Sequence, residues 1–544
     1  MAILDFFRRR PTAQAARERL RAIVVRPAAQ ANPQIDALLT GGGYGTGQGQ
    51  LEGWAPGMGD ADADQLNDLP NLRAYSRDLV RRSPIACGAV ETQLAHIVGT
   101  GLTLQSRIDA EALGMDDEQA SAWQRRTERL FAMWAGSTYA DALGQMDFYE
   151  IQNLAERSKM ESGDCGVLLA GVERPGWPFR LALQIIEADR ISNENCATDT
   201  DRVTQGIERD DSGAPVAAYI ASRHPGRHVV STTPVKWRRV PFRAASGRRL
   251  FLHHMRRLRP GQTRGMPELA PIIEPLKQLT RYSDAEIAAA VNSATLAVFA
   301  KMDPEAFEET FDDEAKEVLI DRAKNWDGKI QPGRVVNLLP GESIESAEMS
   351  RPNPNFGPFV NECMAQIGMA LGIPYEVLVR KFQSSFSAAR AALLDAWRGF
   401  RIRRDLLVSR VCQPVYEEWL ADAVALGLIS APGFFADAET RAAWCGSKWA
   451  GDGPGAIDPE KEVRGAEARV KMGLTTLAEE QVAYDGGEFD AKHRQRVREV
   501  KMRVRDGLEA PAAAAPGAVV TGGPAADQPN DAADGGGGSS NGTQ

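Results

Sequence analysis

Residues Pro352–Tyr416 read PNPNFGPFVNECMAQIGMALGIPYEVLVRKFQSSFSAARAALLDAWRGFRIRRDLLVSRVCQPVY, which predicts two helices joined by a polar loop. In the first helix, apolar residues recur at steps of three and four, so they share one face. Asn355 suits the N-cap of this helix. Gly372 suits a left-handed C-terminal cap, and Pro374 prevents the helix from continuing, so these two residues predict a helix break. The apolar face comprises Phe356, Phe359, Val360, Cys363, Ile367, Ala370 and Leu371.

The second helix is predicted to begin near Ser387, and Pro414 should kink or end its regular part. The segment between the two helices is too polar for a core, so it is either a solvated turn or a contact surface. It contributes the candidate contact residues Arg380, Lys381, Gln383, Ser384 and Ser385. The whole stretch contains no set of residues that could perform bond chemistry.

The composition bounds the class of protein. The chain has 544 residues, 43% of them apolar, which is enough for several domains or one elongated protomer with real cores. Its net charge of −9 argues against a module that grips nucleic acid through a basic face. The same acidity is compatible with a protein through which DNA slides, because a surface that repels phosphate binds it weakly.

The cysteines and the apolar segments exclude other classes. None of the six cysteines forms a CxxC pair, which indicates a reducing compartment, no disulfide framework and no zinc site. The N-terminal MAILDFFRRR lacks the order of charge and apolar run of a signal peptide. No window has 18 uninterrupted apolar residues, so we expect no transmembrane helix and no membrane partner.

Composition changes along the chain suggest its organisation. Residues 1–30 are arginine-rich, for which a solubilising or disordered arm is the simpler interpretation and a specific contact the alternative. Residues 41–64 predict a Gly/Asp-rich linker, and 165–260 predict a β-rich segment that includes a hairpin around Asp211. A helix is expected from about residue 275 to 300, followed by an acidic segment at 302–350 that ends in a strand region around Gly333–Leu339. The tail from Ala510 is low in complexity and is predicted to be disordered.

Candidate catalytic and metal-binding groups have simpler interpretations. Asp60, Asp62 and Asp64 resemble the start of a calcium loop, but the required Gly and Glu are missing, so a solvated linker is favoured. The pair His253–His254 lacks a third metal ligand at helical spacing, and no histidine lies near Cys165 in sequence. Glu161 and Asp164 are interpreted as solvated turn residues. We therefore predict no catalytic residues, no metal site and no cofactor.

The second helix carries more arginines than acids. Two interpretations remain open: a solvated face with ion pairs between subunits, which is the simpler one, and phosphate contact inside a channel. Arg398, Arg401 and Arg404 are the candidates for either role. The cluster consists of Arg390, Arg398, Arg401, Arg403, Arg404 and Arg410, with Asp395 and Asp405 as the acids in the same span.

Four blocks in a fixed order, spread over roughly residues 70–505, carry a resemblance to a known family. They are Arg81–Pro84 through Val98–Gly101, Arg259–Glu268, Gly372–Pro374 with Ser384–Arg390, and Ile457–Glu462 followed by Gly473–Thr476. The chain resembles the lambda-like family of tailed-bacteriophage portal proteins. It has Phe386 where family members commonly have tyrosine, a change that removes one hydroxyl.

The resemblance implies a helix-rich α+β protomer of portal type, with wing, stem, clip and crown, that forms a ring with a central channel. It implies a homo-oligomer, usually of twelve subunits, at one capsid vertex of the virion, with the host cytoplasm as the place of assembly. Implied partners are terminase, the major capsid and head-completion proteins, and double-stranded DNA that passes without sequence-specific binding. Arg380, Lys381, Gln383, Ser384 and Ser385 would face DNA in a tunnel loop.

Helix order suggests how these parts map onto the chain. Two rival functions remain: a scaffold or minor capsid assembly protein without a channel, and a DNA-processing enzyme, for which no P-loop or carboxylate cluster is seen. The expected parts are a flexible basic arm with a Gly/Asp-rich linker (1–65), wing (66–265), stem helix (266–300), clip (301–350), second stem helix (351–373), tunnel loop (374–390), long wing/crown helix (391–430), helical crown (431–505) and disordered tail (506–544).

Overall fold

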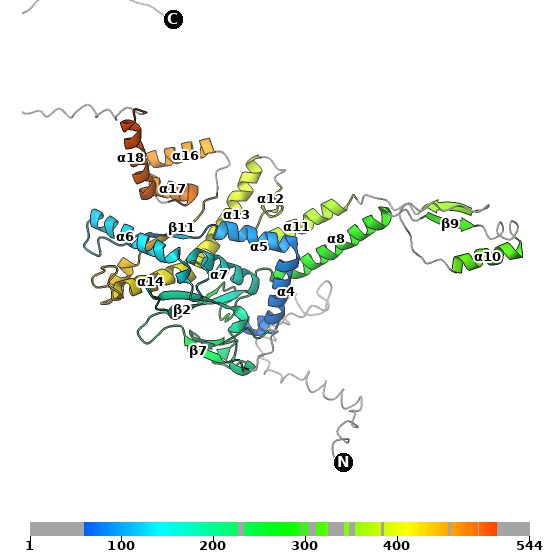
Figure 1. Cartoon of the computed structure of the whole chain (residues 1–544), viewed down its shortest axis with the longest axis horizontal. Coiled ribbons are helices and arrows are strands. Elements are labelled where there is room, and N and C mark those ends of the chain that lie inside the picture. Colours follow the sequence, from blue (N-terminus) through cyan, green and yellow to red (C-terminus); the bar gives the residue numbers. More distant parts are fainter. Residues whose placement is uncertain are drawn as a thin grey trace, which may run out of the picture. The chain divides into compact units, whose positions relative to one another are not determined.

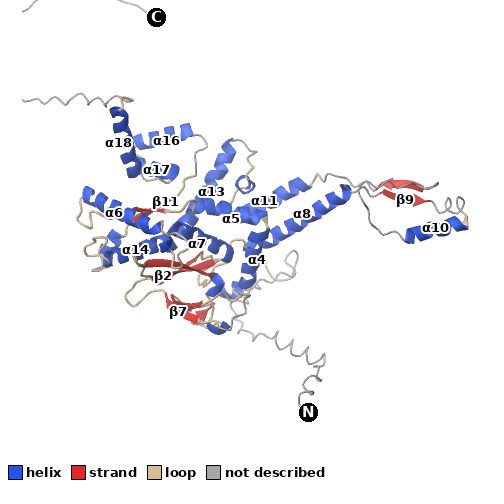
Figure 2. Cartoon of the chain, viewed as in Figure 1, coloured by secondary structure: helices blue, strands red, loops and turns tan. Residues whose placement is uncertain are grey.

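The β-rich middle of the chain forms two antiparallel sheets in the computed structural model, which describes residues 59–226, 233–294, 298–302, 312–324, 342–346, 354–381, 386–454, 459–487 and 489–508 (Figures 1 and 2). The three-stranded sheet has the order β3-β2-β8 and the four-stranded sheet the order β4-β5-β6-β7. The strands are β2 (Asp164–Gly171), β3 (Leu181–Glu187), β4 (Val203–Thr204), β5 (Ile207–Arg209), β6 (Pro215–Ala221), β7 (Trp237–Pro241) and β8 (Phe251–Met255).

The register of the sheets is fixed by short connections and by a shared core. The hairpin predicted around Asp211 is present, with β5 paired antiparallel to β6. Strand β2 is central, and its Cys165 lies opposite Glu187 of β3 and His254 of β8. Apolar side chains from both sheets pack into one cluster, so the two sheets share one hydrophobic core. That cluster comprises Ile186, Ile191, Ile207, Ala218, Ile220, Val240 and Phe251.

The chain divides into two units. The first contains both sheets and is drawn from Met1–Leu94, Trp134–Gln383 and Ile402–Ile429, whereas the second is drawn from Ala95–Met133, Ser384–Arg401 and Ser430–Gln544. Residues 95–133, which fall inside the predicted wing at 66–265, group with C-terminal segments in this division.

Helices of the first unit cover the sheets. Helix α7 (Phe148–Ser162) begins with a capping box between Asp147 and Glu150 and packs on the three-stranded sheet. Trp419 of α14 packs against Phe179, 5.5 Å between ring centres. The other described helices of this unit are α3 (Ala61–Gln65), α4 (Leu69–Arg82), most of α5 (Pro84–Ile97), α8 (Ile273–Ala294), α10 (Asp313–Lys324), α11 (Phe356–Leu371), α12 (Tyr375–Val379) and α14 (Gln413–Ala425).

Helices α8 and α11 form an antiparallel hairpin (Figure 1). Tyr282 of α8 packs against both Phe356 and Phe359 of α11, with ring centres 5.5 and 5.1 Å apart. At about 1.5 Å per residue, the 22 residues of α8 span roughly 33 Å. Of the predicted apolar face of α11, Ile367 and Leu371 are buried, whereas Phe359 is 52% exposed; Met364 and Gly368, outside the predicted face, are also buried.

Three boundaries differ from the sequence prediction, the first because of strand pairing that spacing does not reveal. Helix α8 ends at Ala294 and not near 300, because β9 (Val298–Met302) pairs antiparallel with β10 (Glu342–Ser346). The predicted linker is helical at Ala61–Gln65. Part of the predicted loop 374–390 is also helical, since α12 occupies Tyr375–Val379 and α13 begins at Phe386.

The acidic helix α3 is held by cations far away in sequence. Asp62 pairs with Arg209 at 3.0 Å and accepts a hydrogen bond from the Thr263 amide at 2.8 Å. Asp64 pairs with Arg259 at 2.6 Å. The expectation of a solvated linker is therefore wrong for Asp62, which is largely buried, whereas Asp60 and Asp64 are exposed.

The long second helix is continuous but irregular. Helix α13 (Phe386–Leu407) runs into a π-helical segment, Val408–Cys412, and then into α14. Pro414, at the start of α14, has no backbone N–H to donate, so the regular pattern is interrupted just before it without ending the helix.

The second unit is built around aromatic contacts. Strand β1 (Thr103–Ser106) pairs antiparallel with β11 (Ser447–Ala450). Trp123 of α6 (Asp117–Ala135) packs on Trp444 of α15 (Ala438–Trp444), with ring centres 4.8 Å apart. Helices α16 (Pro459–Lys471), α17 (Leu477–Asp485) and α18 (Phe489–Arg505) come next in the chain.

Several predicted features lie outside the described residues: the arginine-rich arm at 1–30, the strand region Gly333–Leu339 and the tail from Ala510. Within the part of the chain that the structure describes, no helix has both the length and the apolar character to cross a membrane.

Candidate channel and assembly site

The end of helix α11 is a tightly built turn. Gly372 has φ of 67°. Its N–H donates to the Met369 carbonyl at 3.2 Å, and the N–H of Ile373 donates to the Gly368 carbonyl at 2.8 Å. These are the two hydrogen bonds of a Schellman motif. Pro374 then occupies the N-cap position of α12, so the chain changes direction between Leu371 and Tyr375.

Two side chains from other helices fix this helix end. The carbonyl oxygen of Leu371 accepts hydrogen bonds from Gln93 Nε2 and from Arg403 Nη2, each at 2.9 Å. Arg403 lies on α13 and Gln93 on α5. A cation at a helix C-terminus also interacts favourably with the helix dipole. The position of α11 is therefore fixed by polar contacts at its last turn.

Arg403 is the outer end of a chain of buried charges. Its Nη2 lies 3.4 Å from Glu268 Oε2, and Lys159 Nζ lies 3.1 Å from Glu268 Oε1. Lys159 Nζ also lies 2.6 Å from Glu156 Oε1, and His254 Nε2 lies 3.0 Å from Glu156 Oε2. This charge chain links the sheet, α7, the loop before α8 and the end of α11. It borders a cavity of about 470 Å³.

The ionisation of the charge chain results from mutual stabilisation. Burial favours the neutral form of Glu156, but the Lys159 ammonium and the hydrogen bond with His254 outweigh burial and lower the pKa of Glu156 to about 2. Burial also disfavours the charged form of Lys159, yet Glu156 and Glu268 raise its pKa above the usual value. Both groups therefore stay charged while buried.

A second buried network surrounds Asp164. Arg264 donates from all five N–H groups: two to the Asp164 carboxylate, at 2.7 and 2.9 Å, and three to carbonyl oxygens at 2.7 Å. Arg73 adds an ion pair at 3.1 Å. Burial opposes ionisation of Asp164, but the two guanidinium groups outweigh it and hold its pKa well below the usual range. The expectation that Asp164 is solvated is wrong, because its side chain is fully buried.

Close backbone approach explains two glycines beside this network. A Cβ added to Gly265 would lie 1.9 Å from the Gly163 carbonyl oxygen, and one added to Gly163 would lie 2.2 Å from the Gly265 carbonyl oxygen. No side chain fits at either position. The loop before α8 is therefore pressed directly against the start of β2.

The candidate loop residues are only partly described. Arg380 has φ of 54° and caps α12, and the amide of Lys381 donates to the Glu376 carbonyl at 3.1 Å. Both side chains lie at least partly in solvent. Gln383, Ser384 and Ser385 lie outside the described residues.

The structure distinguishes among the arginines of α13. Arg390 pairs with Glu462 of α16 at 3.2 Å, and Arg403 belongs to the charge chain. Arg398 and Arg401 are exposed, and Arg404 is half-buried. The role of these last three in contacting phosphate or a neighbouring subunit stays a prediction.

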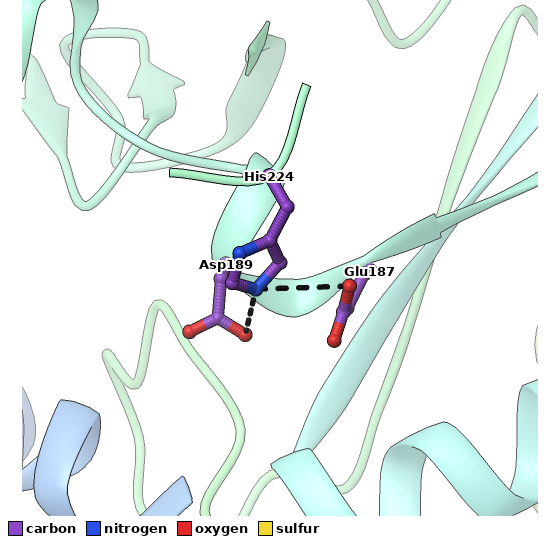
Figure 3. Close-up of side chains that lie close together, drawn as sticks. All are labelled: Glu187, Asp189 and His224. Atoms are coloured by element: carbon purple, nitrogen blue, oxygen red, sulfur yellow. Dashed lines mark ion pairs between the residues drawn. The ribbon is translucent and has the colours of Figure 1, made fainter. Parts of the chain in front are cut away.

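Among the described residues, Glu187, Asp189 and His224 have the composition of a metal site (Figure 3). His224 Nε2 lies 3.7 Å from Glu187 Oε2 and 3.7 Å from Asp189 Oδ2. However, the Gly226 amide donates to His224 Nδ1 at 2.9 Å, so the neutral ring carries its proton on Nε2 and presents no lone pair there. Arg77 also pairs with both carboxylates. We assign the cluster to an ion-pair network.

Comparisons of the sequence with known proteins point to one family. The family model described as phage portal protein, lambda family, matches residues 47–404. Portal protein B of Escherichia phage lambda is 28% identical over 494 residues, covering 87% of this chain and 91% of that protein. The portal protein of Escherichia phage N15 is also 28% identical, with 87% and 92% covered.

The solved structures that resemble this chain include the virion of a native gene transfer agent particle, at 13% identity and a TM-score of 0.41, with 76% of this chain and 92% of that chain covered. The neck of the empty particle gives 15% identity and a TM-score of 0.42, with 69% and 85% covered.

The family match covers well over half of the chain and defines a structural protein of phage particles. The chain belongs to the lambda family of phage portal proteins. The predicted family is thus confirmed, as is the prediction that the protein is structural and not enzymatic. A channel-free scaffold and a DNA-processing enzyme are set aside.

The buried charge chain yields the first testable prediction. In Lys159→Met, Glu156 would lose its cation while remaining buried, so we expect the free energy of unfolding to fall by about 3–5 kcal/mol. Adding Glu156→Gln should restore part of that loss. Urea unfolding of the four proteins of this double-mutant cycle measures the coupling, and additive effects would contradict the charge chain.

A second prediction contrasts two glycines. Gly372→Ala should destabilise the protein by about 1 kcal/mol, since φ is positive there. Gly399→Ala, in helix α13 with open space around its Cβ, should stabilise it by about 0.5–1 kcal/mol. The shift of the urea midpoint, at an unchanged m-value, measures each change in stability. If both substitutions change the stability in the same direction, the role given to Gly372 is wrong.

Proposed function

We propose that copies of this chain form a ring at one capsid vertex and that double-stranded DNA passes through its channel during packaging and ejection. The resemblance implies twelve subunits, assembled in the host cytoplasm. Terminase, the major capsid protein and head-completion proteins are the proposed partners. No sequence-specific DNA binding is expected, which agrees with the net charge of −9.

The observation that best supports assembly is the apolar surface of the α8–α11 hairpin. Ile287 and Val291 of α8 are 61% and 60% exposed, and Phe359 and Met369 of α11 are 52% and 78% exposed. These residues lie on the two helices of one hairpin, and an exposed apolar surface can mark a binding site. Copies of the same hairpin are suitable partners, because closed rings bring equivalent elements of neighbours together.

The portal parts can be assigned to observed elements. The sheets with α4, α5 and α7 would form the wing, and α8 with α11 the stem. The clip would comprise β9, α10 and β10. The tunnel loop would lie between α12 and α13, around Arg380 and Lys381, and α16–α18 would contribute to the crown.

Assembly through the hairpin predicts the effect of a charge on its apolar surface. Ile287→Glu should prevent ring formation, because the carboxylate would be desolvated at the interface, while the monomer keeps its fold. Gln278→Glu is the matched control, since Gln278 is a polar, exposed residue of the same helix. Light scattering and negative-stain images measure the oligomer, and rings formed equally by both variants would exclude this surface.

The loop assignment predicts a separate defect. Arg380→Glu or Lys381→Glu should impair DNA packaging or retention more than ring assembly, because the change repels phosphate without touching the hairpin. Arg125→Glu, at an exposed position of α6, controls for the change in net charge. Packaged DNA per particle is the measurement, and normal packaging by the loop variants would show that the loop is not the DNA contact.

A further inference from the structure

Helix α18 is strongly basic in an acidic chain. It carries seven Lys and Arg residues against Asp490 and Glu499, whereas the whole chain has 64 basic and 73 acidic residues. Four of the cations recur at spacings of four, three and four residues, which places them within about 60° of arc on one side of a helix. We call these the basic stripe: Arg494, Arg498, Lys501 and Arg505.

The stripe faces solvent, and its cations are largely uncompensated. All four side chains are exposed. Arg505 pairs with Asp506 at 2.8 Å, but Arg494, Arg498 and Lys501 have no ion pair with any of the described residues. Val497, Val500 and Val504 lie along one edge of the stripe, about 70–130° around the helix from its centre, so no apolar residue interrupts the stripe. The stripe is therefore a purely cationic surface about 16 Å long.

Helix α16, in the same unit, has the opposite charge arrangement. In α16, Arg464 pairs with Glu460 at 2.6 Å and Lys471 with Glu467 at 2.7 Å, each with the acid one turn before the cation. Arg469 pairs with Glu480 of α17 at 2.6 Å. An acid one turn before a cation, as in these two α16 pairs, stabilises a helix. Like charges one turn apart, as in the stripe, destabilise it.

We propose that the basic stripe of α18 binds the phosphate backbone of double-stranded DNA. A polyanion would relieve the repulsion among the four cations, of which Arg494, Arg498 and Lys501 have no ion pair with any described residue. Duplex DNA carries one charge per about 1.7 Å, so the stripe matches about ten phosphate charges in length. Without base-reading amides or an apolar wedge, the contact depends on charge and not on sequence.

An acidic protein is the competing ligand, and the composition of the stripe argues against it. The buried centres of protein interfaces are enriched in apolar and aromatic residues and depleted of lysine. The stripe has neither apolar nor aromatic members. The proposal deepens the proposed portal function and rests on it, because the passage of DNA is what brings a duplex to this protein.

The test compares two triple variants of the full chain that lose the same charge. Arg494→Gln/Arg498→Gln/Lys501→Gln removes the unpaired cations of the stripe. The control, Arg464→Gln/Arg469→Gln/Lys471→Gln, removes three cations of the same segment that are paired with Glu460, Glu480 and Glu467. Circular dichroism checks that both keep their helices. Fluorescence anisotropy with a labelled duplex of mixed sequence measures Kd between about 50 and 200 mM salt.

The stripe variant should raise Kd at least about tenfold at 50 mM salt and reduce the slope of log K against log salt by about 3, because three phosphate contacts are lost. The control should change neither by more than about twofold. A stripe variant that binds DNA like the control overturns the proposal. Loss of binding to poly-L-glutamate with DNA binding retained would also overturn it, in favour of an acidic protein partner.

Negative-stain images of the same variants separate this proposal from the portal function. Rings that form normally while DNA binding falls support the stripe as a DNA contact. Loss of rings by the stripe variant alone would show an assembly surface and would overturn the proposal. If the parent chain forms no rings, the proposed ring assembly is contradicted. The anisotropy measurement then still tests DNA binding by the stripe.

Discussion

The first unit depends on one buried ion pair between Arg264 and Asp164. All five N–H groups of Arg264 are used, and their acceptors lie on three separate segments: Asp164, the turn that holds Ala188 and Ile191, and Gln205. One side chain thus joins the start of β2, the turn after β3, the turn before β5 and the loop before α8. Removal of either partner would leave an uncompensated buried charge, which is far more costly than loss of a surface pair.

The ion pair matters for function because it positions the residues that lead into helix α8. The backbone at Gly265 lies directly against that at Gly163. Three residues later, Glu268 forms an ion pair with Lys159 through one carboxylate oxygen and with Arg403 through the other. Arg403 in turn reaches the last carbonyl of α11. The bases of both hairpin helices are therefore fixed by charges, whereas the outer part of the hairpin exposes apolar residues. This division holds the hairpin in place while leaving its surface available to neighbours.

Sequence spacing predicted the elements whose cause is local and missed those whose cause is distant. The helix at Phe356–Leu371 and its end at Gly372 are explained by periodicity and by glycine's access to positive φ. The end of α8 is not, because β9 finds its partner strand some forty residues later. Sequence alone predicts a solvated Asp164, because its partners, Arg73 and Arg264, are 91 and 100 residues away. In the sequence, the block Arg259–Glu268 indicates only a family resemblance. The ion pairs of Arg264 and Glu268 become visible only in the folded structure, because their partners are distant in sequence.

The distribution of charge is compatible with the proposed passage of DNA. The net charge of −9 repels phosphate overall, and we propose that attraction comes from exposed cations such as Arg380, Lys381 and the basic stripe. Exposed ion pairs are weak and screened within about 10 Å at ordinary salt. Contacts of that kind are made and broken without a large barrier, and they read no bases. A neutral or basic protomer would add attraction everywhere and hold the duplex, so the acidity of this chain favours DNA passage over DNA storage.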